Sequence, residues 1–298
     1  METSPATSAP TLPMPALPES APTDWPRISV ITAVRDDLEG LRRTHASLAA
    51  QRERSFDWIV VDGGSLDGTR DYLLRHHCDL FWWRSQPDGG IFDAMNHGLA
   101  KAGGDYLLFL NAGDTLPEPD TFARVLRALA EAGVPDLVYG DTYERAPDGH
   151  IHLKPARDRR LVWYGMFTHH QAFFYHRRVV DGLRYDLDYK VGADYAFTIA
   201  ALRRARSVLR LHIPLAVCAP PGWSALHPAI GRRDQWRIRR NLLALPPFVC
   251  NAIALFQNMT WHVRTTFPYL FHKLRFRRPR ESQPASVVQT RPKQRAIP

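Results

Sequence analysis

GGDYLLFLNAGDT, residues 103–115, is the stretch of sequence that decides the fold. A Gly-Gly turn precedes an apolar run, residues 106–110, and a loop of small residues then leads to Asp114. An apolar run of this length between turn residues is typical of a strand buried on both faces. Ligands of open α/β sheets bind just beyond the carboxyl ends of the strands, which is where Asp114 stands. The alternative interpretation is that Asp114 only caps the next turn.

Similar segments on both sides of this stretch predict alternating strands and helices. Strands are expected at residues 28–34, 56–61, 80–83, 103–114, 136–143 and 208–217, and helices at 38–50, 70–77, 91–101, 119–132 and 190–202. Asp120 or Thr121 is the expected cap of the helix at 119–132. This alternation predicts an α/β fold with a doubly wound, mainly parallel sheet flanked by helices.

Composition indicates a folded domain with appended segments. The chain has 298 residues and is 45% apolar, enough for one large domain plus an appendage. Residues 1–26, rich in Pro, Ala, Ser and Thr, and the last residues, 281–298, are expected to be disordered. The three cysteines form no CxxC pair, which favours a reducing compartment. The N-terminus does not have the pattern of a secretory signal peptide.

The charge is concentrated at the C-terminal end. The net charge is +9; from residue 228 onward, 14 Lys or Arg and two acidic residues give +12, so the rest carries −3. The segment 226–280 places apolar and aromatic residues beside basic clusters, and its unbroken apolar runs are too short to span a bilayer. Such a segment suits the interface of an anionic membrane. The alternative is a helical extension that packs on the core or mediates a dimer.

Four separated motifs resemble the family 2 glycosyltransferases, which have the GT-A fold. They are ISVITAVRDD at 28–37, FDWIVVDGGSLDGT at 56–69, PDGGIFDAMNHGLAKAGGDYLLFLNAGD at 87–114 and KVGADYAF at 190–197. Together with HHQAFFY at 169–175, they are similar to bacterial members that build cell-surface polysaccharides. The resemblance covers residues 27–202 and implies a GT-A domain over 27–225. It implies transfer of a sugar from a UDP- or GDP-linked donor to a hydroxyl of a lipid-linked glycan acceptor.

The resemblance assigns the donor nucleotide to the first half of the sheet. Asp62 is placed like the family Asp that accepts a hydrogen bond from the edge of uracil or guanine. Thr32, Ala33 and Arg35, at the end of the first strand, would line the same pocket. The alternative is that Asp62 stabilises the turn that follows it.

Three further polar residues flank the donor side. Asp88 lies in a Pro-Asp-Gly-Gly turn, where it is either a ligand or part of the turn. Asp93 and Asn96 are three residues apart and share a helix face. They are expected either to bind donor sugar hydroxyls or to cap neighbouring loops.

Asp114 is the predicted ligand of a divalent cation, Mg²⁺ or Mn²⁺. Such an ion neutralises the charge that develops on a departing diphosphate, and hard cations prefer oxygen ligands. Many relatives carry an Asp-x-Asp pattern here, whereas this chain has Asn111-Ala112-Gly113-Asp114. Asn111 therefore leaves metal-independent transfer open.

Asp194 is the predicted general base, because relatives carry an acidic residue in a comparable segment. Inversion at the anomeric carbon needs a group that takes the proton of the acceptor hydroxyl. An N-cap role for Asp194 is the alternative. His169 and His170 lack a third ligand at metal spacing, so one of them, with Gln171, is expected to contact the acceptor or the diphosphate.

Two other functions compete with sugar transfer. A nucleotidyltransferase would need a Gly-rich loop with a basic residue after the first strand, where this chain has Arg35-Asp36-Asp37. A nucleic-acid-binding protein could use the basic tail, but no helix-turn-helix or RNA-binding motif accompanies that charge. No nucleic-acid partner is therefore expected. The predicted location is cytoplasmic, at the inner face of the cell membrane.

Overall fold

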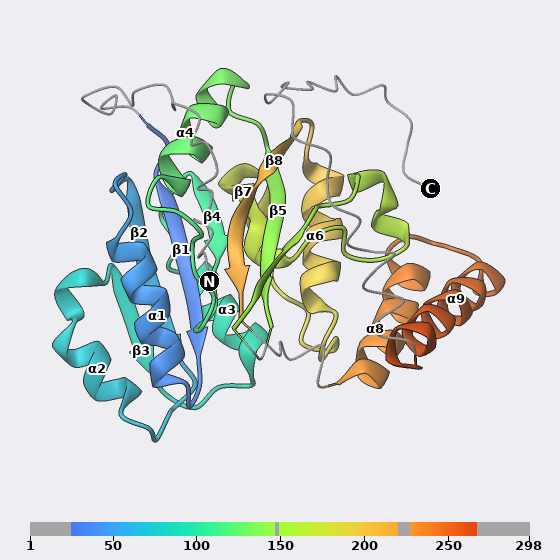
Figure 1. Cartoon of the computed structure of the whole chain (residues 1–298), viewed down its shortest axis with the longest axis horizontal. Coiled ribbons are helices and arrows are strands. Elements are labelled where there is room, and N and C mark those ends of the chain that lie inside the picture. Colours follow the sequence, from blue (N-terminus) through green and yellow to red (C-terminus); the bar gives the residue numbers. More distant parts are fainter. Residues whose placement is uncertain (1–24, 147–148, 220–226, 267–298) are drawn as a thin grey trace, which may run out of the picture.

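The structure, a computed structural model, describes residues 25–146, 149–219 and 227–266 (Figure 1). The disorder expected for residues 1–24 and 281–298 concerns parts of the chain outside these ranges. The turn expected at residues 147–149 also lies largely outside them, as does the segment 267–280 of the C-terminal extension.

A mixed eight-stranded sheet lies at the centre of the molecule (Figure 1). The strand order is β3-β2-β1-β4-β7-β5-β6, and β8 also pairs with β5. The strands are β1 (Ile28–Val34), β2 (Phe56–Asp62), β3 (Trp82–Ser85), β4 (Tyr106–Phe109), β5 (Leu137–Arg145), β6 (Ile151–Lys154), β7 (Phe173–His176) and β8 (Val208–Cys218). The first four are parallel to one another, which confirms the predicted doubly wound core.

The helices follow the predicted order with shifts of a few residues at their ends. They are α1 (Leu38–Ala49), α2 (Thr69–Arg75), α3 (Ile91–Leu99), α4 (Thr121–Glu131), α5 (Arg177–Val180), α6 (Ala193–Arg204), α8 (Pro228–Asn241) and α9 (Pro247–Thr266), with short 3-10 turns η1 (His77–Asp79), η2 (Arg159–Trp163) and η3 (His170–Ala172). Asp37 caps α1 by accepting from the Gly40 amide at 2.8 Å. Asp120 occupies the N-cap position of α4, but its side chain makes no capping bond.

The two faces of the sheet are covered by different helices, because successive side chains of a strand point to opposite faces. Ile31 of β1 and Phe109 of β4 belong to a cluster that includes α3 and α6. Val30 and Leu108, one position earlier in each strand, belong to a second cluster that includes α1, α2 and α4. All seven residues of β1 are buried, as expected for a strand covered on both faces.

The antiparallel strand β7 is the main departure from the predicted sheet. It lies between β4 and β5 and pairs with both in antiparallel fashion. The aromatic segment that contains it has no period-2 pattern, because both faces of β7 are buried. The β5–β6 hairpin was also not predicted.

The C-terminal helix α8 packs on the domain. Ile238 and Leu243 belong to the same buried cluster as α6. The Arg239 side chain is fully buried and donates to the carbonyl oxygens of Trp163 at 3.1 Å and Tyr164 at 2.6 Å. The composition of the chain changes at the expected domain boundary, residue 225. Helix α8, which follows this boundary, nevertheless packs on the domain. Within the described ranges, no helix combines the length and the apolar character needed to cross a bilayer.

Gly104 is required where the loop before β4 crosses the start of β1. A Cβ atom at this position would lie 2.7 Å from the Arg27 carbonyl oxygen and 2.7 Å from the Ser29 amide nitrogen. We expect Gly104→Ala to lower the free energy of unfolding by about 1–3 kcal/mol in urea denaturation, because both neighbours are backbone atoms. Gly103→Ala is the matched control, because a Cβ atom there would have no neighbour within 4 Å. Equal stability of the two variants would contradict this prediction.

Candidate functional site

The loops that follow β1, β2 and β4 meet at the carboxyl edge of the parallel strands. The loop after β2 is held to β1 by the Gly63 amide, which donates to the Val34 carbonyl at 2.9 Å. The loop after β4 is held to the same strand by the Ala112 amide, which donates to the Ala33 carbonyl at 3.1 Å. The sequence-predicted residues of these loops therefore share one edge, at the point where the strand order reverses around β1.

Asp114 is a buried acidic group of this edge, with 4% of its surface exposed. Its Oδ2 accepts from Gln171 Nε2 at 2.7 Å, and its Oδ1 accepts from the Ala219 amide at 2.8 Å. Burial raises the pKa of this carboxyl, and the two donors and His170 oppose that rise. The side chain points into the site and does not cap a turn.

His170 connects the Asp114 loop to helix α6. The side chain of Asn111 lies 3.2 Å from His170 Nε2, and His170 Nδ1 lies 3.6 Å from Asp194 Oδ2. Because β7 is antiparallel, the residues just before it lie at the carboxyl end of β4. The fold thus brings together Asn111, Asp114, His170, Gln171 and Asp194, which the sequence places far apart.

Two buried amide oxygens at this point have no hydrogen-bond partner. They are Asn111 Oδ1 and Gln171 Oε1. Both residues are 9% exposed, and unsatisfied buried oxygens are uncommon in folded proteins. Amide and carboxylate oxygens such as those of Asn111, Gln171 and Asp114 are the ligands that a hard divalent cation prefers.

Asp194 lies in the first turn of α6 and does not cap it; Gly192 is the N-cap residue. Its Oδ1 accepts from the Tyr195 amide at 2.7 Å. The side chain keeps 22% of its surface exposed. The other carboxylate oxygen, Oδ2, faces His170.

Asp62 and Thr32 are enclosed by the protein itself. Asp62 is 0% exposed and accepts from the Ser65 amide at 3.1 Å, the Ser65 hydroxyl, and the Ser85 hydroxyl at 2.6 Å. The Thr32 hydroxyl donates to the Leu110 carbonyl at 2.7 Å and accepts from Trp58 Nε1 at 2.9 Å. Both side chains hold the loops of the edge in place, and their assignment to the nucleotide pocket remains a prediction.

Asp88 approaches the loop after β2 from the other side. Its Oδ1 accepts from the Gly90 amide at 2.8 Å, and its buried Oδ2 has no hydrogen-bond partner. A Cβ atom on Gly63 would lie 3.1 Å from Asp88 Oδ2 and 3.4 Å from Arg35 Cδ. Asp88, Arg35 and the backbone of Gly63 therefore lie together. Ala33 is buried at the end of β1 beside them.

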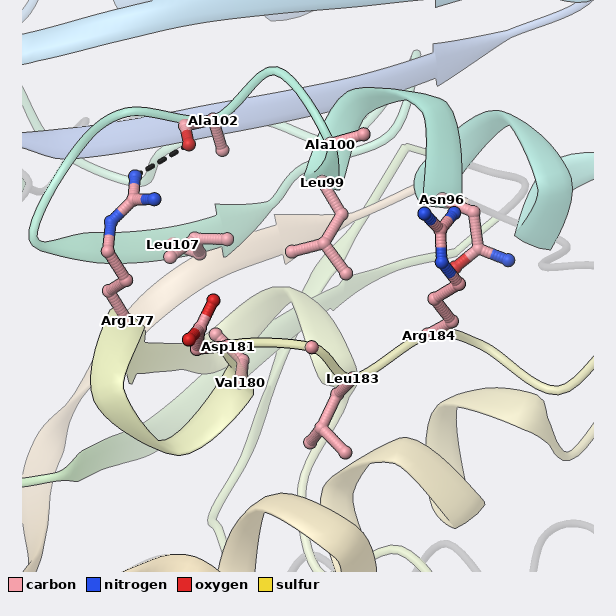
Figure 2. Close-up of a pocket in the computed structure, with 11 residues that line it drawn as sticks. Asn96, Leu99, Ala100, Ala102, Leu107, Arg177, Val180, Asp181, Leu183 and Arg184 are labelled. Atoms are coloured by element: carbon pink, nitrogen blue, oxygen red, sulfur yellow. Dashed lines mark hydrogen bonds between the residues drawn. The ribbon is translucent and has the colours of Figure 1, made fainter.

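Asp93 and Asn96 contact the protein itself. Asp93 accepts from the Gly89 amide at 2.9 Å. Asn96 binds both backbone groups of Tyr185, with its Nδ2 3.0 Å from the carbonyl and its Oδ1 2.7 Å from the amide. Figure 2 shows Asn96 beside a cavity that is also lined by Leu107, near the amino end of β4. This edge is opposite to the one that holds Asp114, so the geometry favours the loop-capping interpretation of Asn96.

Two charged residues of the β5–β6 hairpin were missed from the sequence. Lys154 Nζ, Glu144 Oε1 and His169 Nε2 lie within 2.9 Å of one another. The hydrogen bond to His169 and the charge of Lys154 lower the pKa of Glu144, whereas burial lowers the pKa of His169. The Pro-Asp-Gly sequence at residues 147–149 indicates a turn and is the only sign of the hairpin in the sequence. No local pattern indicates that the side chains of this hairpin reach His169.

A second group of possible metal ligands lies on the outer side of α1. Asp79 Oδ2 is 3.4 Å from His45 Nε2 and 3.3 Å from His76 Nδ1. His45 Nδ1 is 2.7 Å from the Tyr72 hydroxyl, so a hydrogen-bonded Tyr-His-Asp chain already satisfies this imidazole. These three side chains could hold a metal ion, and none of them belongs to the group around Asp114.

Comparisons with known proteins agree with this geometry. The model of "Glycosyl transferase family 2" matches residues 29–184. An uncharacterized glycosyltransferase of Mycobacterium tuberculosis H37Rv is 38% identical over 187 residues, which cover 60% of this chain and 70% of the relative. A PGL/p-HBAD biosynthesis glycosyltransferase of Mycobacterium bovis BCG is 34% identical over 196 residues, with 64% and 76% covered.

Solved structures share the fold at low sequence identity. Residues 1–349 of TarS from S. aureus, in complex with UDP-GlcNAc, align with a TM-score of 0.60 at 18% identity, covering 84% of this chain and 77% of that one. A mannosyltransferase from Pyrobaculum calidifontis, in complex with GDP-Man and Mn²⁺, aligns with a TM-score of 0.53 at 21% identity, covering 79% and 72%. The match of the family model over half of the chain, the GT-A arrangement and the acidic carboxyl edge lead to one conclusion: this chain belongs to glycosyl transferase family 2 and is a sugar-transferring enzyme.

Proposed function

We propose that this glycosyltransferase inverts the anomeric centre while it moves a sugar from a nucleoside diphosphate to a hydroxyl of a glycan acceptor. The observation that carries the proposal is the contact path from Asn111 through His170 to Asp194, which joins the Asp114 loop to the start of α6. A diphosphate at Asp114 and a hydroxyl at Asp194 would meet across this path. Inversion requires such an arrangement, because the base acts on the face opposite the departing diphosphate.

Asp194 is the proposed general base. Its backbone hydrogen bond uses Oδ1, which leaves Oδ2 for His170 and for the acceptor hydroxyl. His170 and Gln171 are the proposed contacts of the diphosphate or the acceptor. His169, tied to Glu144 and Lys154, supports the same segment from the hairpin.

The donor is proposed to be UDP- or GDP-linked, as in the two related structures, which hold UDP-GlcNAc and GDP-Man. The pocket for base and ribose is proposed at Asp62, Thr32, Ala33 and Arg35. Asp88 is the strongest candidate ligand on this side, because its Oδ2 is buried without a partner. Roles for Asp93 and Asn96 in binding the sugar remain part of the prediction.

A divalent cation, Mg²⁺ or Mn²⁺, is proposed to bind at Asp114 with the free oxygens of Asn111 and Gln171. When bound, the cation would neutralise negative charge on the departing diphosphate. Asn111 supplies a neutral oxygen where many relatives carry a carboxylate. We therefore expect weaker metal binding than two carboxylates would give.

The acceptor is proposed to be a lipid-linked glycan. A relative named for PGL/p-HBAD biosynthesis and another named for O-antigen biosynthesis support an acceptor of this class. The basic C-terminal end supports contact with an anionic membrane at its cytoplasmic face.

Asp194→Asn should nearly abolish transfer and leave nucleotide binding intact. We expect turnover to fall at least about 100-fold, because the amide cannot take a proton from the acceptor. Turnover is followed as release of the nucleoside diphosphate, and binding by calorimetry. Asp188→Asn, an exposed carboxylate in the preceding loop, is the matched control and should keep full activity. Unchanged turnover of Asp194→Asn would exclude this residue as the base.

Nucleotide binding can be measured by thermal unfolding with UDP, GDP, CMP or ATP, each with and without Mn²⁺. We expect UDP or GDP to raise the melting temperature by several degrees, since a ligand at 100 times its Kd stabilises by about 2.7 kcal/mol. Mn²⁺ should enlarge the shift in the wild type, more so in Asn111→Asp, and not in Asp114→Asn. A folded protein that responds to none of these nucleotides would contradict the donor site.

A further inference from the structure

Helix α9 presents an apolar face that no described residue covers. Apart from Trp261 (44% exposed), its exposed large side chains are Phe248 (73% exposed), Leu255 (63%), Phe256 (55%), Met259 (58%) and Val263 (48%). At about 100° per residue these positions fall within a stripe roughly 100° wide along the whole helix. Single exposed apolar residues are ordinary, but a continuous stripe of large ones indicates a binding surface.

The opposite side of α9 is the one that packs on the domain. Cys250 is fully buried and Ile253 is 6% exposed. Gln257 Nε2 donates to the Tyr164 carbonyl at 2.9 Å. These three residues are spaced as one helix face, so the direction of the exposed stripe is set by packing on α8 and η2.

The C-terminal segments that include the stripe carry a net positive charge. Helix α9 contains no acidic residue. The acidic residue of α8, Asp234, is buried, whereas Arg232, Arg233 and Arg237 are wholly or partly exposed. Arg232 lies over the ring of Trp261, 6.0 Å from its centroid, in the second half of α9. The 32 residues after Thr266 add eight Lys or Arg and one Glu.

We propose that α9 lies in the interface of an anionic bilayer, with Phe248, Leu255, Phe256, Met259 and Val263 as the inserted face. Positive charge around an apolar stripe complements anionic headgroups. The same charge would oppose pairing of this face with a second copy of the chain. This proposal extends the lipid-linked acceptor of the proposed function, because α9 packs on α8, and α8 contacts the start of α6, where Asp194 lies (Figure 1).

Sedimentation with vesicles tests this surface without donor or acceptor, so its result is independent of the transfer reaction. We expect at least tenfold stronger partitioning onto phosphatidylglycerol–phosphatidylcholine vesicles than onto pure phosphatidylcholine. Leu255→Glu/Met259→Glu should lower the binding at least tenfold. The matched control is Leu74→Glu/Phe81→Glu, which alters residues 49% and 56% exposed near α2 and should bind as the wild type.

Three results would overturn the proposal. One is vesicle binding that the α9 double variant leaves unchanged. Another is a wild-type dimer without vesicle affinity that the α9 variant turns into a monomer, which would assign the face to a second copy. The third concerns a chain ended after Thr266, which should retain a measurable preference for anionic vesicles; loss of that preference would transfer the role to the last residues.

A separate observation concerns the start of α6. Asp234 of α8 accepts from the amides of Val191 at 2.8 Å and Gly192 at 3.1 Å through its Oδ2. The side chain is 2% exposed. A Cβ atom on Gly192 would lie 2.9 Å from Ile238 Cδ1, so the two helices approach as closely as glycine permits. Gly192 offers no capping side chain, and Asp234 instead binds the last two amides before the helix, those of Val191 and Gly192.

We infer that Asp234 is a positioning residue for Asp194, which follows Gly192 by two residues. The inference rests on the proposed role of Asp194 as base. Burial of the Asp234 carboxylate against two amides holds the first turn of α6 in one place. It therefore holds the Asp194 carboxylate at its distance from His170.

The kinetic test separates positioning from stability. Asp234→Ala should lower kcat at least tenfold with the KM for the donor changed less than twofold, and Asp234→Asn, which keeps an accepting oxygen, should recover most of the rate. Ile238→Val is the control for a loosened α8 and should lower the melting temperature with kcat nearly unchanged. Equal losses of kcat in Asp234→Ala and Ile238→Val would overturn the inference. An inactive Asp194→Asn with a fully active Asp234→Ala would overturn it and leave the base assignment standing.

Discussion

The arrangement of the site depends on the buried carboxylate of Asp114. It binds Gln171 from the segment before β7 and the Ala219 amide after β8, while its own carbonyl accepts from the Thr44 hydroxyl of α1 at 2.8 Å. Three distant segments therefore meet at one residue. A buried carboxyl group is costly unless it is hydrogen-bonded, and Gln171 and the Ala219 amide each donate to one of its two oxygens, whereas Thr44 holds the backbone.

The antiparallel strand β7 makes this meeting possible. A parallel strand beside β4 would bring its carboxyl end to the site and its preceding residues to the far edge. Because β7 runs the other way, His169, His170 and Gln171 enter at the carboxyl edge of β4. The adjacent histidines then point to different partners, one toward Glu144 and Lys154 and the other toward Asn111 and Asp194. One reversed strand thus links the loop after β4 to the start of α6.

The C-terminal helices have two physical roles on opposite sides. The inner side of α8 completes the domain, with Arg239 bound to backbone carbonyls of η2 and Asp234 bound to the start of α6. Removing the chain after residue 231 would expose these buried groups and disturb α6, so such a deletion cannot test membrane contact alone. The outer side of α9 makes none of these contacts and can vary without cost to the core.

The sequence by itself determined the elements whose pattern is local. The strands β1, β2 and β4, and with them the places of the loop acids Asp62 and Asp114, could be assigned because burial on both faces leaves a continuous apolar run. The motif around Asp194 was assigned only through its resemblance to the family. Only the tertiary structure decided the neighbours of those residues. The contact of Asp62 with Ser85, the clamp of Asn96 on Tyr185, and the binding of Asp234 to the start of α6 join residues 23 to 89 positions apart. Hydrogen bonds across such separations follow from strand order and helix packing, which no local pattern of residues encodes.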